Sequence, residues 1–165
     1  TYIDATMGNG HDTLFLCELA GKEGQVLAFD IQKQALESTR ALLKSEGMEQ
    51  KARLILDSHE NMAKYADEAS VDGICFNFGY LPGSDHSLAT KPESSKNAVI
   101  EGLRLLKKGG VMSLCIYSGG ETGFEERDTL LAYLKSLDEK KYLVIVSAYY
   151  NRKNNPPIPV LIIKK

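Results

Sequence analysis

Short apolar runs alternate with amphipathic segments of helical length along the whole chain, and this alternation constrains the fold more than any other feature. Seven runs have the length and composition of strands: 1–6, 25–31, 52–57, 71–78, 110–118, 142–150 and 158–165. Five segments between them have a helical pattern: 11–20, 33–46, 59–67, 92–108 and 122–140. A strand–helix alternation of this kind predicts an α/β fold, with a mostly parallel sheet and helices on both faces.

Local signals mark where several of these elements end. Gly21 and Gly47 follow the first two predicted helices, where glycine is a common C-terminal cap, and Pro92 suits the first turn of the fourth. Only "NRKNNPP" separates the last two strands, which is too short for a parallel crossover that carries a helix. We therefore expect these two strands to pair antiparallel, with the last strand at one edge of a seven-stranded sheet.

Composition narrows the class of protein. The 165 residues, of which 43% are hydrophobic, fit one globular domain over 1–165, and the opening inside a strand without Met suggests that an N-terminal segment is missing. The net charge of -2 gives no global attraction to nucleic acid or an anionic membrane, so any RNA contact must be local. Three cysteines in apolar runs predict reduced thiols in a cytoplasmic protein, and no run is long enough to span a membrane.

The stretch "DATMGNGHDT", 4–13, follows the first predicted strand and opens the first helix. Gly8 and Gly10 allow the backbone to pass close to a ligand, and the helix N-terminus offers free N–H groups. Asp30 ends the second strand, 20 residues beyond Gly10, where a carboxylate can bind the hydroxyls of a ribose. A plain strand-to-helix turn is the alternative, and the position of Asp30 favours a nucleoside-type cofactor over it.

The same stretch discriminates between cofactors. It lacks the "GK[ST]" of a triphosphate site, and Thr13 stands in place of the third glycine of the dinucleotide fingerprint. Asp4 would repel a pyrophosphate but could accept a hydrogen bond from an ammonium group. S-adenosylmethionine carries a cationic amino acid and a sulfonium on an adenosine, and it has no phosphate. It therefore suits this acidic glycine turn better than NAD does.

The segment "NFGYLPG", 77–83, stands at the end of the fourth strand, where open α/β sheets bind their ligands. Asn77 offers a carboxamide oxygen and Tyr80 an aromatic face, which together could align an uncharged acceptor amine with a departing sulfonium. This arrangement resembles the Asn/Asp-Pro-Pro-Tyr element of amino-methylating enzymes. The alternative is an Asn-Gly-Pro turn with a half-buried tyrosine.

Six ordered segments resemble the motifs of one family over essentially the whole chain. They are "DATMGNGHDT", "AFDIQ", "LDSHENM", "NFGYLPGSDH", "IYSGGETGFEE" and "NRKNNPP". The family is that of the small methyltransferases described as "putative rRNA methylases", whose members include tRNA 5-aminomethyl-2-thiouridine methyltransferases. The resemblance implies a Rossmann-like class I methyltransferase fold. It also implies methyl transfer from S-adenosylmethionine to the aminomethyl nitrogen of the wobble uridine in tRNA.

The resemblance also assigns residues to roles. The cofactor would lie against Asp4, Thr6, Gly8, Asn9, Gly10, Asp12, Thr13, Asp30, Ile31, Asp57, Ser58, His59 and Asn77. The acceptor and its RNA would contact Tyr80, Asp85, His86, Tyr117, Gly119, Gly120, Arg152, Lys153, Asn155 and Pro156. The candidate catalytic residues are Asn77, Tyr80 and His86. Many relatives have Gly-His where this chain has Gly119-Gly120, so no role of that histidine is carried over.

Histidines and exposed basic residues have two interpretations each. His86 could take the proton lost by the amine, because imidazole titrates near neutral pH, or it could stabilise the turn with a hydrogen bond. The three histidines have neither helical i,i+4 spacing nor cysteine companions, so we predict no metal site. Arg152 and Lys153 are candidate phosphate contacts, and the alternative is two solvated side chains of a loop.

More than one function is compatible with a cofactor site of this kind. The sequence favours an RNA-modifying enzyme that acts on tRNA. The alternatives are an rRNA methyltransferase, a methyltransferase of a small amine or protein side chain, and a nucleotide-binding module without chemistry. The module is disfavoured because "NFGYLPG" stands where an acceptor must bind. A homodimer is left open, since no segment marks an interface.

Overall fold

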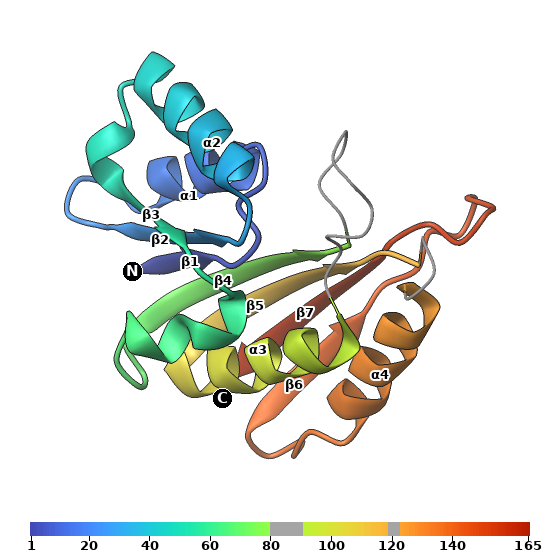
Figure 1. The fold of residues 1–165 in the computed structure, drawn as a ribbon. Helices are drawn as coiled ribbons and strands as arrows, with labels where there is room; N and C mark the ends of the chain where they lie inside the picture. The colour runs from blue at the N-terminus through green and yellow to red at the C-terminus, as the bar shows by residue number, and fades with distance from the viewer. Residues whose placement is uncertain (80–90, 119–122) are drawn as a thin grey trace.

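The computed structural model describes residues 1–79, 91–118 and 123–165 (Figure 1). The strands are β1 Tyr2–Asp4, β2 Val26–Asp30, β3 Ala52–Leu56, β4 Val71–Phe78, β5 Leu106–Ile116, β6 Tyr142–Val146 and β7 Ile158–Lys164. The α-helices are α1 His11–Leu19, α2 Lys33–Ser45, α3 Pro92–Leu105 and α4 Gly123–Lys135, and the 3₁₀ helices are η1 Glu49–Lys51 and η2 His59–Lys64. The predicted α/β alternation is confirmed.

One seven-stranded sheet has the order β3-β2-β1-β4-β5-β7-β6. Strands β1 to β5 are parallel, and β7 is antiparallel to both of its neighbours. The last two strands therefore form an antiparallel pair at one edge, as predicted. One detail differs from the expectation: β6 is outermost and the last strand β7 lies one place inside, because β7 pairs along both of its sides.

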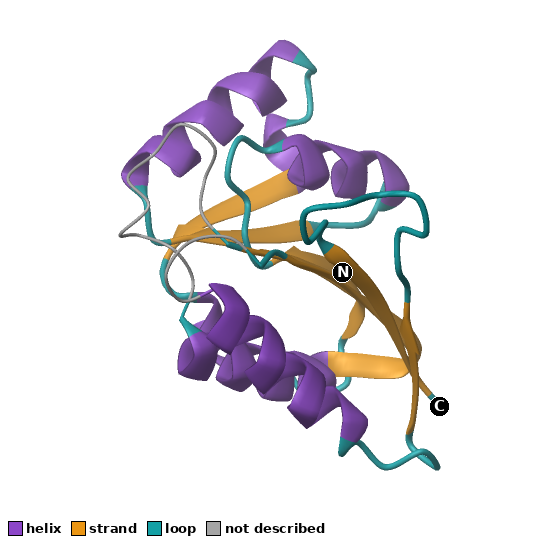
Figure 2. Cartoon of the chain, turned by 90° about the vertical axis from the view of Figure 1, so that its right-hand side faces the viewer, coloured by secondary structure: helices purple, strands orange, loops and turns teal. Residues whose placement is uncertain are grey.

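Helices cover both faces of the sheet, which the alternation of the sequence predicted (Figures 1 and 2). Helices α1 and α2 pack on one face, whereas α3, α4 and η2 pack together on the other. The core on the α3 side contains the fully buried rings of Phe29, Phe76 and Phe78, and the last two stack at 4.9 Å between centroids. None of the helices in the described part of the chain combines the length and the apolar composition that crossing a membrane would need.

The junction between α3 and β5 lies earlier than the sequence indicates. Helix α3 ends at Leu105 instead of 108, and β5 begins at Leu106 instead of 110. The ammonium group of Lys164 donates hydrogen bonds of 2.8 Å to the carbonyls of Leu103 and Leu106. Those groups would otherwise be orphan acceptors at the helix end. This contact joins residues that are far apart in sequence, which is why local patterns do not reveal it.

The strand predicted over 142–150 stops at Val146, so Tyr149 and Tyr150 lie in the loop that follows. The Ser147 N–H still donates to the Pro159 carbonyl at 2.9 Å. Beyond that bond, Pro156 and Pro157 have no N–H to continue the ladder. The prediction over 59–67 was also wrong in type, because this segment forms the short 3₁₀ helix η2. The predicted caps at Gly21 and Gly47 are confirmed by their left-handed φ angles of 65° and 68°, and Pro92 stands in the first turn of α3.

Gly10→Ala is expected to destabilise the fold more than Gly47→Ala does. Both glycines have a positive φ, which costs an alanine about 1 kcal/mol. A Cβ at Gly10 would also lie 2.8 Å from the Thr39 Oγ1, whereas no described atom comes within 4 Å of one at Gly47. We expect the free energy of unfolding, measured by urea titration, to fall by about 1 kcal/mol for Gly47→Ala and about 2–4 kcal/mol for Gly10→Ala. Equal losses would contradict the close approach of α2 to the glycine turn.

Candidate functional site

The sheet order brings four polar side chains together at the carboxyl ends of the parallel strands. Asp4, Asp30 and Asn77 stand at the carboxyl ends of β1, β2 and β4, and Asp57 directly follows β3. The chain leaves β1 toward β2 on one side, and β4 flanks β1 on the other. In an open parallel sheet, the crevice at this switch in strand order is the ligand-binding position. The candidate site is therefore the region around the carboxyl ends of β1 and β4.

The turn between β1 and α1, residues 5–10, is held from two sides. The N–H of Gly8 donates to Asp30 Oδ2 at 3.1 Å, and the Thr39 hydroxyl donates to the Gly8 carbonyl at 3.1 Å. Gly10 is the N-cap of α1, with a φ of 86° and no side chain to cap the helix. The first N–H groups of α1 have no acceptor within the helix, and they stand beside the exposed Asn9. The turn has the geometry of an anion or carboxylate cradle.

Asp4 lies beneath this turn and is completely buried. Its carboxylate accepts hydrogen bonds from the Thr13 hydroxyl at 2.6 Å and from the Thr6 N–H at 3.2 Å. Burial raises the pKa of Asp4 to about 6, although these hydrogen bonds favour the ionised form. The direct bond from a ligand ammonium that the sequence suggested does not fit this geometry. Asp4 shapes the turn through Thr13 and Thr6.

Asp30 remains open to a ligand. It is half-buried and accepts hydrogen bonds from the Gly8 N–H and, at 2.9 Å, from the Gln32 N–H. Two backbone bonds leave lone pairs of the carboxylate for further donors. The next side chain, Ile31, is 57% exposed, so an apolar surface adjoins the carboxylate. A carboxylate beside an apolar face is suited to a nucleoside, because the ribose is polar and the base is flat.

Asp57 is held at the end of β3 by a set of donors. The Asn61 amide donates at 2.8 Å, the Tyr65 hydroxyl at 2.9 Å, and the Ser58 N–H at 2.7 Å. The hydrogen bond from Asn61, followed by that from Tyr65, holds the pKa of Asp57 below its usual value. Arg53 stacks on the Tyr65 ring at 5.3 Å. Asp57 is therefore a fixed acceptor that stays ionised.

His59 is placed differently from the adenine contact that the resemblance implied. Its ring packs edge-on against Phe76 and Phe78 at about 6 Å between centroids, and its Nε2 is buried without a hydrogen-bond partner among the described residues. Burial lowers the pKa of His59, against a backbone hydrogen bond to Ala5. This half-buried side chain packs against the core on the α3 side of the sheet.

Asn77 is the polar group at the end of β4, and its amide is oriented by another element. The side-chain N–H donates to Asp12 Oδ2 on α1 at 2.6 Å, and the backbone N–H donates to the Thr6 hydroxyl at 2.7 Å. Because the amide nitrogen is held by Asp12, the amide oxygen is left to accept; no described residue bonds it. Asp12 itself is exposed. The pair presents a fixed acceptor beside a carboxylate.

Tyr117 follows β5 beside this pair and is 43% exposed. Its N–H donates to the Phe78 carbonyl at 3.3 Å, and its ring lies about 3.7 Å from the position of a Cβ at Gly79. Burial raises the pKa of Tyr117, and Cys115 adds to the shift. Tyr117 therefore borders the end of β4 on the β5 side. The predicted site residues Tyr80, Asp85, His86, Gly119 and Gly120 lie outside the described residues.

The loop between β6 and β7, residues 147–157, carries the remaining predicted contacts. Arg152 lies 5.7 Å above the centroid of the Tyr149 ring, and Lys153 follows it in an exposed position. Asn155 is exposed with a φ of 49°, and Pro156 is half-buried. In the ranges 1–79, 91–118 and 123–165, no group of three or more His, Cys, Asp or Glu residues could hold a metal ion.

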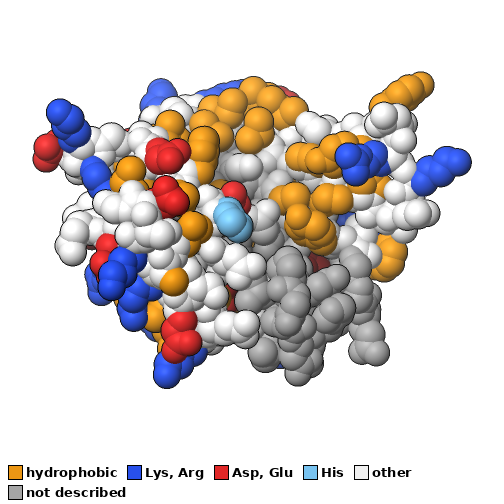
Figure 3. Space-filling view, turned by 90° about the horizontal axis from the view of Figure 1, so that it is seen from above, with side chains coloured by type: hydrophobic (Ala, Val, Ile, Leu, Met, Phe, Trp, Pro, Cys, Tyr) orange, Lys and Arg blue, Asp and Glu red, His pale blue; other side chains and the backbone are white. Residues whose placement is uncertain are grey.

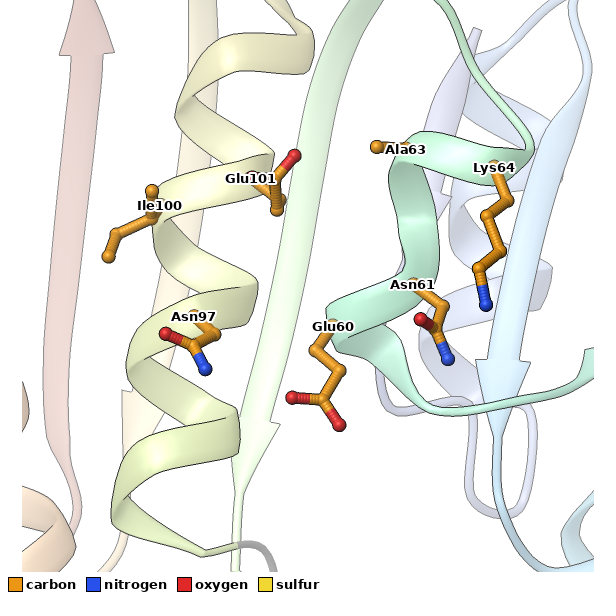
Figure 4. Close-up of a pocket in the computed structure, with 7 residues that line it drawn as sticks. All are labelled: Glu60, Asn61, Ala63, Lys64, Asn97, Ile100 and Glu101. Carbon is orange, nitrogen blue, oxygen red and sulfur yellow. The ribbon is translucent and has the colours of Figure 1, made fainter.

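A cavity of about 370 Å³ lies away from the glycine turn, between η2 and α3 (Figure 4). Its lining residues are Glu60, Asn61, Ala63, Lys64, Asn97, Ile100 and Glu101. The lining carries charges of both signs, and it lies beside α3 instead of at the switch between β1 and β4. We therefore do not assign the cofactor to this cavity.

Three positioning residues were missed from the sequence. Thr39 holds the Gly8 carbonyl, and Asn61 and Tyr65 hold Asp57 from four and eight residues further along. The roles of Asn61 and Tyr65 could have been predicted, because residues four and eight positions after Asp57 lie on the same face of a helical segment. No sequence pattern indicated Thr39, because its contact depends on how α2 packs against the turn.

The chemistry of the site is selective among cofactors. Residues 4–13 include two carboxylates, Asp4 and Asp12, and no Lys or Arg. A pyrophosphate would meet these charges unfavourably. A zwitterionic amino acid attached to an adenosine fits better, because the helix N-terminus suits its carboxylate, the exposed Asp12 its ammonium and Asp30 its ribose.

Comparison with known proteins gives consistent matches. The family model described as "Putative rRNA methylase" matches residues 26–163. A chloroplastic tRNA (mnm(5)s(2)U34)-methyltransferase of Arabidopsis thaliana is 36% identical over 98% of this chain, which spans 61% of that protein's length. A ribosomal RNA small subunit methyltransferase H of Streptococcus mutans is 33% identical over 47% of this chain and 26% of its own length.

Two solved structures share the fold at appreciable sequence identity. A protein described as a putative rRNA-methylase, from Clostridium thermocellum, matches with a TM-score of 0.96 at 44% identity, covering 99% of this chain and 88% of that one. A protein of Streptococcus mutans described as a putative methyltransferase, solved in complex with SAH, matches with a TM-score of 0.89 at 38% identity and the same coverage of both chains.

Asp4→Asn is expected to gain stability relative to the parent as pH rises. A pKa of about 6 in the folded chain, against 3.8 when unfolded, means that stability is lost as pH rises from about 4 through 6, where the buried carboxyl ionises. The difference in free energy of unfolding, variant minus parent, should therefore grow between pH 4.5 and 7.5, toward a limit of about 3 kcal/mol for the full shift. Urea titrations at several pH values measure it, and geometric losses add only a constant. Thr13→Val should raise the pKa of Asp4 further in an NMR titration, and a flat difference would contradict the buried ionised state.

Proposed function

Because this chain belongs to the family described as "Putative rRNA methylase", we propose that it transfers a methyl group from S-adenosylmethionine to the 5-aminomethyl nitrogen of wobble 2-thiouridine in tRNA. The family and the class I methyltransferase fold predicted from the sequence are confirmed. The single observation that carries the proposal for the reaction is the Asn77 amide, whose nitrogen is held by Asp12 and whose oxygen is left to accept.

The cofactor half of the proposal rests on the residues around the glycine turn. Asp30 would accept from the ribose, Ile31 would lie against the base, and the first N–H groups of α1 would receive the carboxylate. S-adenosylmethionine, when bound, supplies an electrophilic methyl group. The Streptococcus mutans relative was solved with SAH, which supports a cofactor of this class.

The acceptor half rests on Asn77 and Asp12. An amine attacks only when it is neutral and its lone pair points at the methyl group. A carboxamide oxygen that accepts one N–H of the amine fixes that direction, and Asp12 keeps the amide from rotating. Tyr117 would border the space for the uracil ring. The task of these residues is mainly to orient the acceptor.

The RNA half rests on the relatives and on two cationic side chains. The Arabidopsis relative is named for wobble uridine in tRNA, and its 36% identity extends over nearly the whole of this chain. Arg152 and Lys153 would meet phosphates locally, which agrees with a net charge of -2. A cytoplasmic location fits the free cysteines Cys17, Cys75 and Cys115. Ribosomal RNA is the second candidate substrate, because the Streptococcus mutans methyltransferase H matches about half of the chain.

A methyl-transfer assay with labelled cofactor tests the proposal. The substrates are tRNA from a strain that lacks the modification, ribosomal RNA, and free amines, and the product nucleosides are identified by mass spectrometry. We expect label in the wobble nucleoside of tRNA. Label in ribosomal RNA or a free amine alone would overturn the substrate assignment and leave the cofactor assignment intact.

Asp30→Asn is expected to weaken SAH binding by about 1–3 kcal/mol, because hydrogen bonds from ribose to a charged acceptor are among the stronger ones. Isothermal titration measures the change. Glu37→Gln on the exposed side of α2 is the matched control and should bind SAH like the parent. An unchanged affinity of Asp30→Asn would remove this residue from the cofactor site.

Asn77→Ala is expected to lower kcat about 100-fold with little change in SAH affinity, because its interaction is realised when the amine is aligned. Asp12→Ala should lower kcat less, since the Asn77 amide stays in place but loses the acceptor that fixes its orientation. This variant should also bind SAH more weakly, because the exposed Asp12 carboxylate is the acceptor proposed for the ligand ammonium. Steady-state kinetics with tRNA and titration with SAH separate the two effects. Normal turnover of Asn77→Ala would mean that this residue only shapes the end of β4.

A further inference from the structure

We propose that the loop between β6 and β7, residues 147–157, is an arm that stacks on an unpaired RNA base, with Tyr150 as the stacking ring. The inference rests on the proposed function, because it takes the substrate to be RNA with unpaired nucleotides near the site. It adds a recognition element that neither the reaction nor the phosphate contacts require.

Tyr150 is exceptional in its exposure. Its relative accessibility is 104%, whereas the next most exposed large hydrophobic side chain described, Phe15, reaches 60%. The ring makes no packing contribution to the fold. Tyrosine is enriched at interfaces, because its ring is apolar and its hydroxyl can stay hydrated. Both faces of the ring are open to a planar ligand.

The neighbouring tyrosine has a different task. The guanidinium of Arg152 lies 5.7 Å from the centroid of the Tyr149 ring, within the range of a cation–π contact. One face of Tyr149 is thereby occupied, while the N–H groups at the guanidinium edge remain available to phosphate oxygens. Tyr149 therefore positions Arg152 for the backbone of the RNA, and Tyr150 is the ring left for a base.

The loop has a defined shape before any partner binds. Asn154 and Asn155 have left-handed φ angles of 64° and 49°, which asparagine tolerates, and the two prolines that follow have a fixed φ. The Ser147 N–H closes the base of the loop on the Pro159 carbonyl. A loop that is already ordered loses little conformational entropy when it binds.

The arm lies next to the acceptor side of the site. Tyr117 directly follows Ile116, which pairs with Ile158 where the loop ends, and Cys115 pairs with Asn77 on β4. Asp12 holds the Asn77 amide from α1. The loop projects beyond the sheet at the end where β4 and β5 finish (Figure 1). Seen from above, hydrophobic and basic side chains stand together on that side of the molecule (Figure 3).

This combination selects single-stranded RNA. A base in a duplex is covered by its neighbours, whereas a loop base can stack on an aromatic side chain. Cationic side chains beside the ring bind the phosphates without reading sequence. The geometry therefore points to a loop nucleotide next to the modified uridine, held by Tyr150 while that uridine occupies the crevice.

The test uses anticodon stem-loop RNAs that each carry 2-aminopurine at one loop position. We expect the fluorescence at one position to be quenched by the wild-type chain and by Tyr150→Phe, which keeps the ring. Tyr150→Ala should lose that quenching and bind about 5- to 30-fold more weakly. Phe15→Ala, an exposed ring on α1, is the control and should behave like the wild type. Arg152→Gln should flatten the salt dependence of binding by about 0.7 per lost contact, and Tyr150→Ala should leave the slope unchanged.

The outcomes separate this inference from the proposed function. The stacking role of the arm is overturned if Tyr150→Ala binds the RNA as tightly as the wild type, or if Phe15→Ala loses as much RNA affinity as Tyr150→Ala does. Either result counts even when the chain methylates tRNA. If Tyr150→Ala loses binding and quenching while no methyl group reaches the wobble uridine, the arm is supported and the substrate assignment fails. Unchanged SAH affinity in all four variants is expected, and a parallel loss of SAH affinity in Tyr150→Ala would overturn a role confined to RNA.

Discussion

The site depends on the hydrogen bond between the buried Asp4 carboxylate and the Thr13 hydroxyl, 2.6 Å long. It ties the end of β1 to the first turn of α1, so the chain must turn sharply over residues 5–10. A negative charge beneath a helix N-terminus also interacts favourably with the helix dipole. With the turn fixed, the N–H of Gly8 reaches Asp30, and the backbone at Gly10 can approach Thr39 on α2. A buried carboxylate is unfavourable for folding, and the shape of the turn is what it maintains.

Sequence patterns were reliable where a segment is buried and its ends are locally marked. Strand β4 matches its prediction over 71–78, since a run of apolar residues ends there at a glycine. The patterns failed where the decisive contact is remote, as at the α3–β5 junction held by Lys164. In the candidate site, the glycine turn and Asp30 were recognisable, because their spacing follows from one strand and one helix. The burial of Asp4 and His59 could not be predicted from the sequence, because burial of a polar side chain depends on what packs over it.

The charges of the molecule are divided between the two halves of the proposed reaction. Asp4, Asp12 and Asp30 surround the glycine turn, where a cationic ligand without phosphate would bind. Arg152 and Lys153 lie on the β6–β7 loop, where phosphates would be met. Residues 4–13 carry no Lys or Arg, so the cofactor turn offers a phosphate group no cationic side chain of its own. A chain with a net charge of -2 can therefore bind an anionic polymer without drawing phosphate groups into the cofactor turn.

The position of the β6–β7 loop follows from the direction of one strand. Because β7 is antiparallel to both β5 and β6, these two strands run the same way, and the carboxyl end of β6 lies at the same edge as that of β5. The connection from β6 to β7 must then lie at the end of the sheet where Asn77 and Tyr117 are found. If β7 were parallel, its start would lie at the opposite edge, and the chain after β6 would have to cross the sheet to reach it. The antiparallel strand thus places a short loop of aromatic and basic residues beside the acceptor site without any additional element.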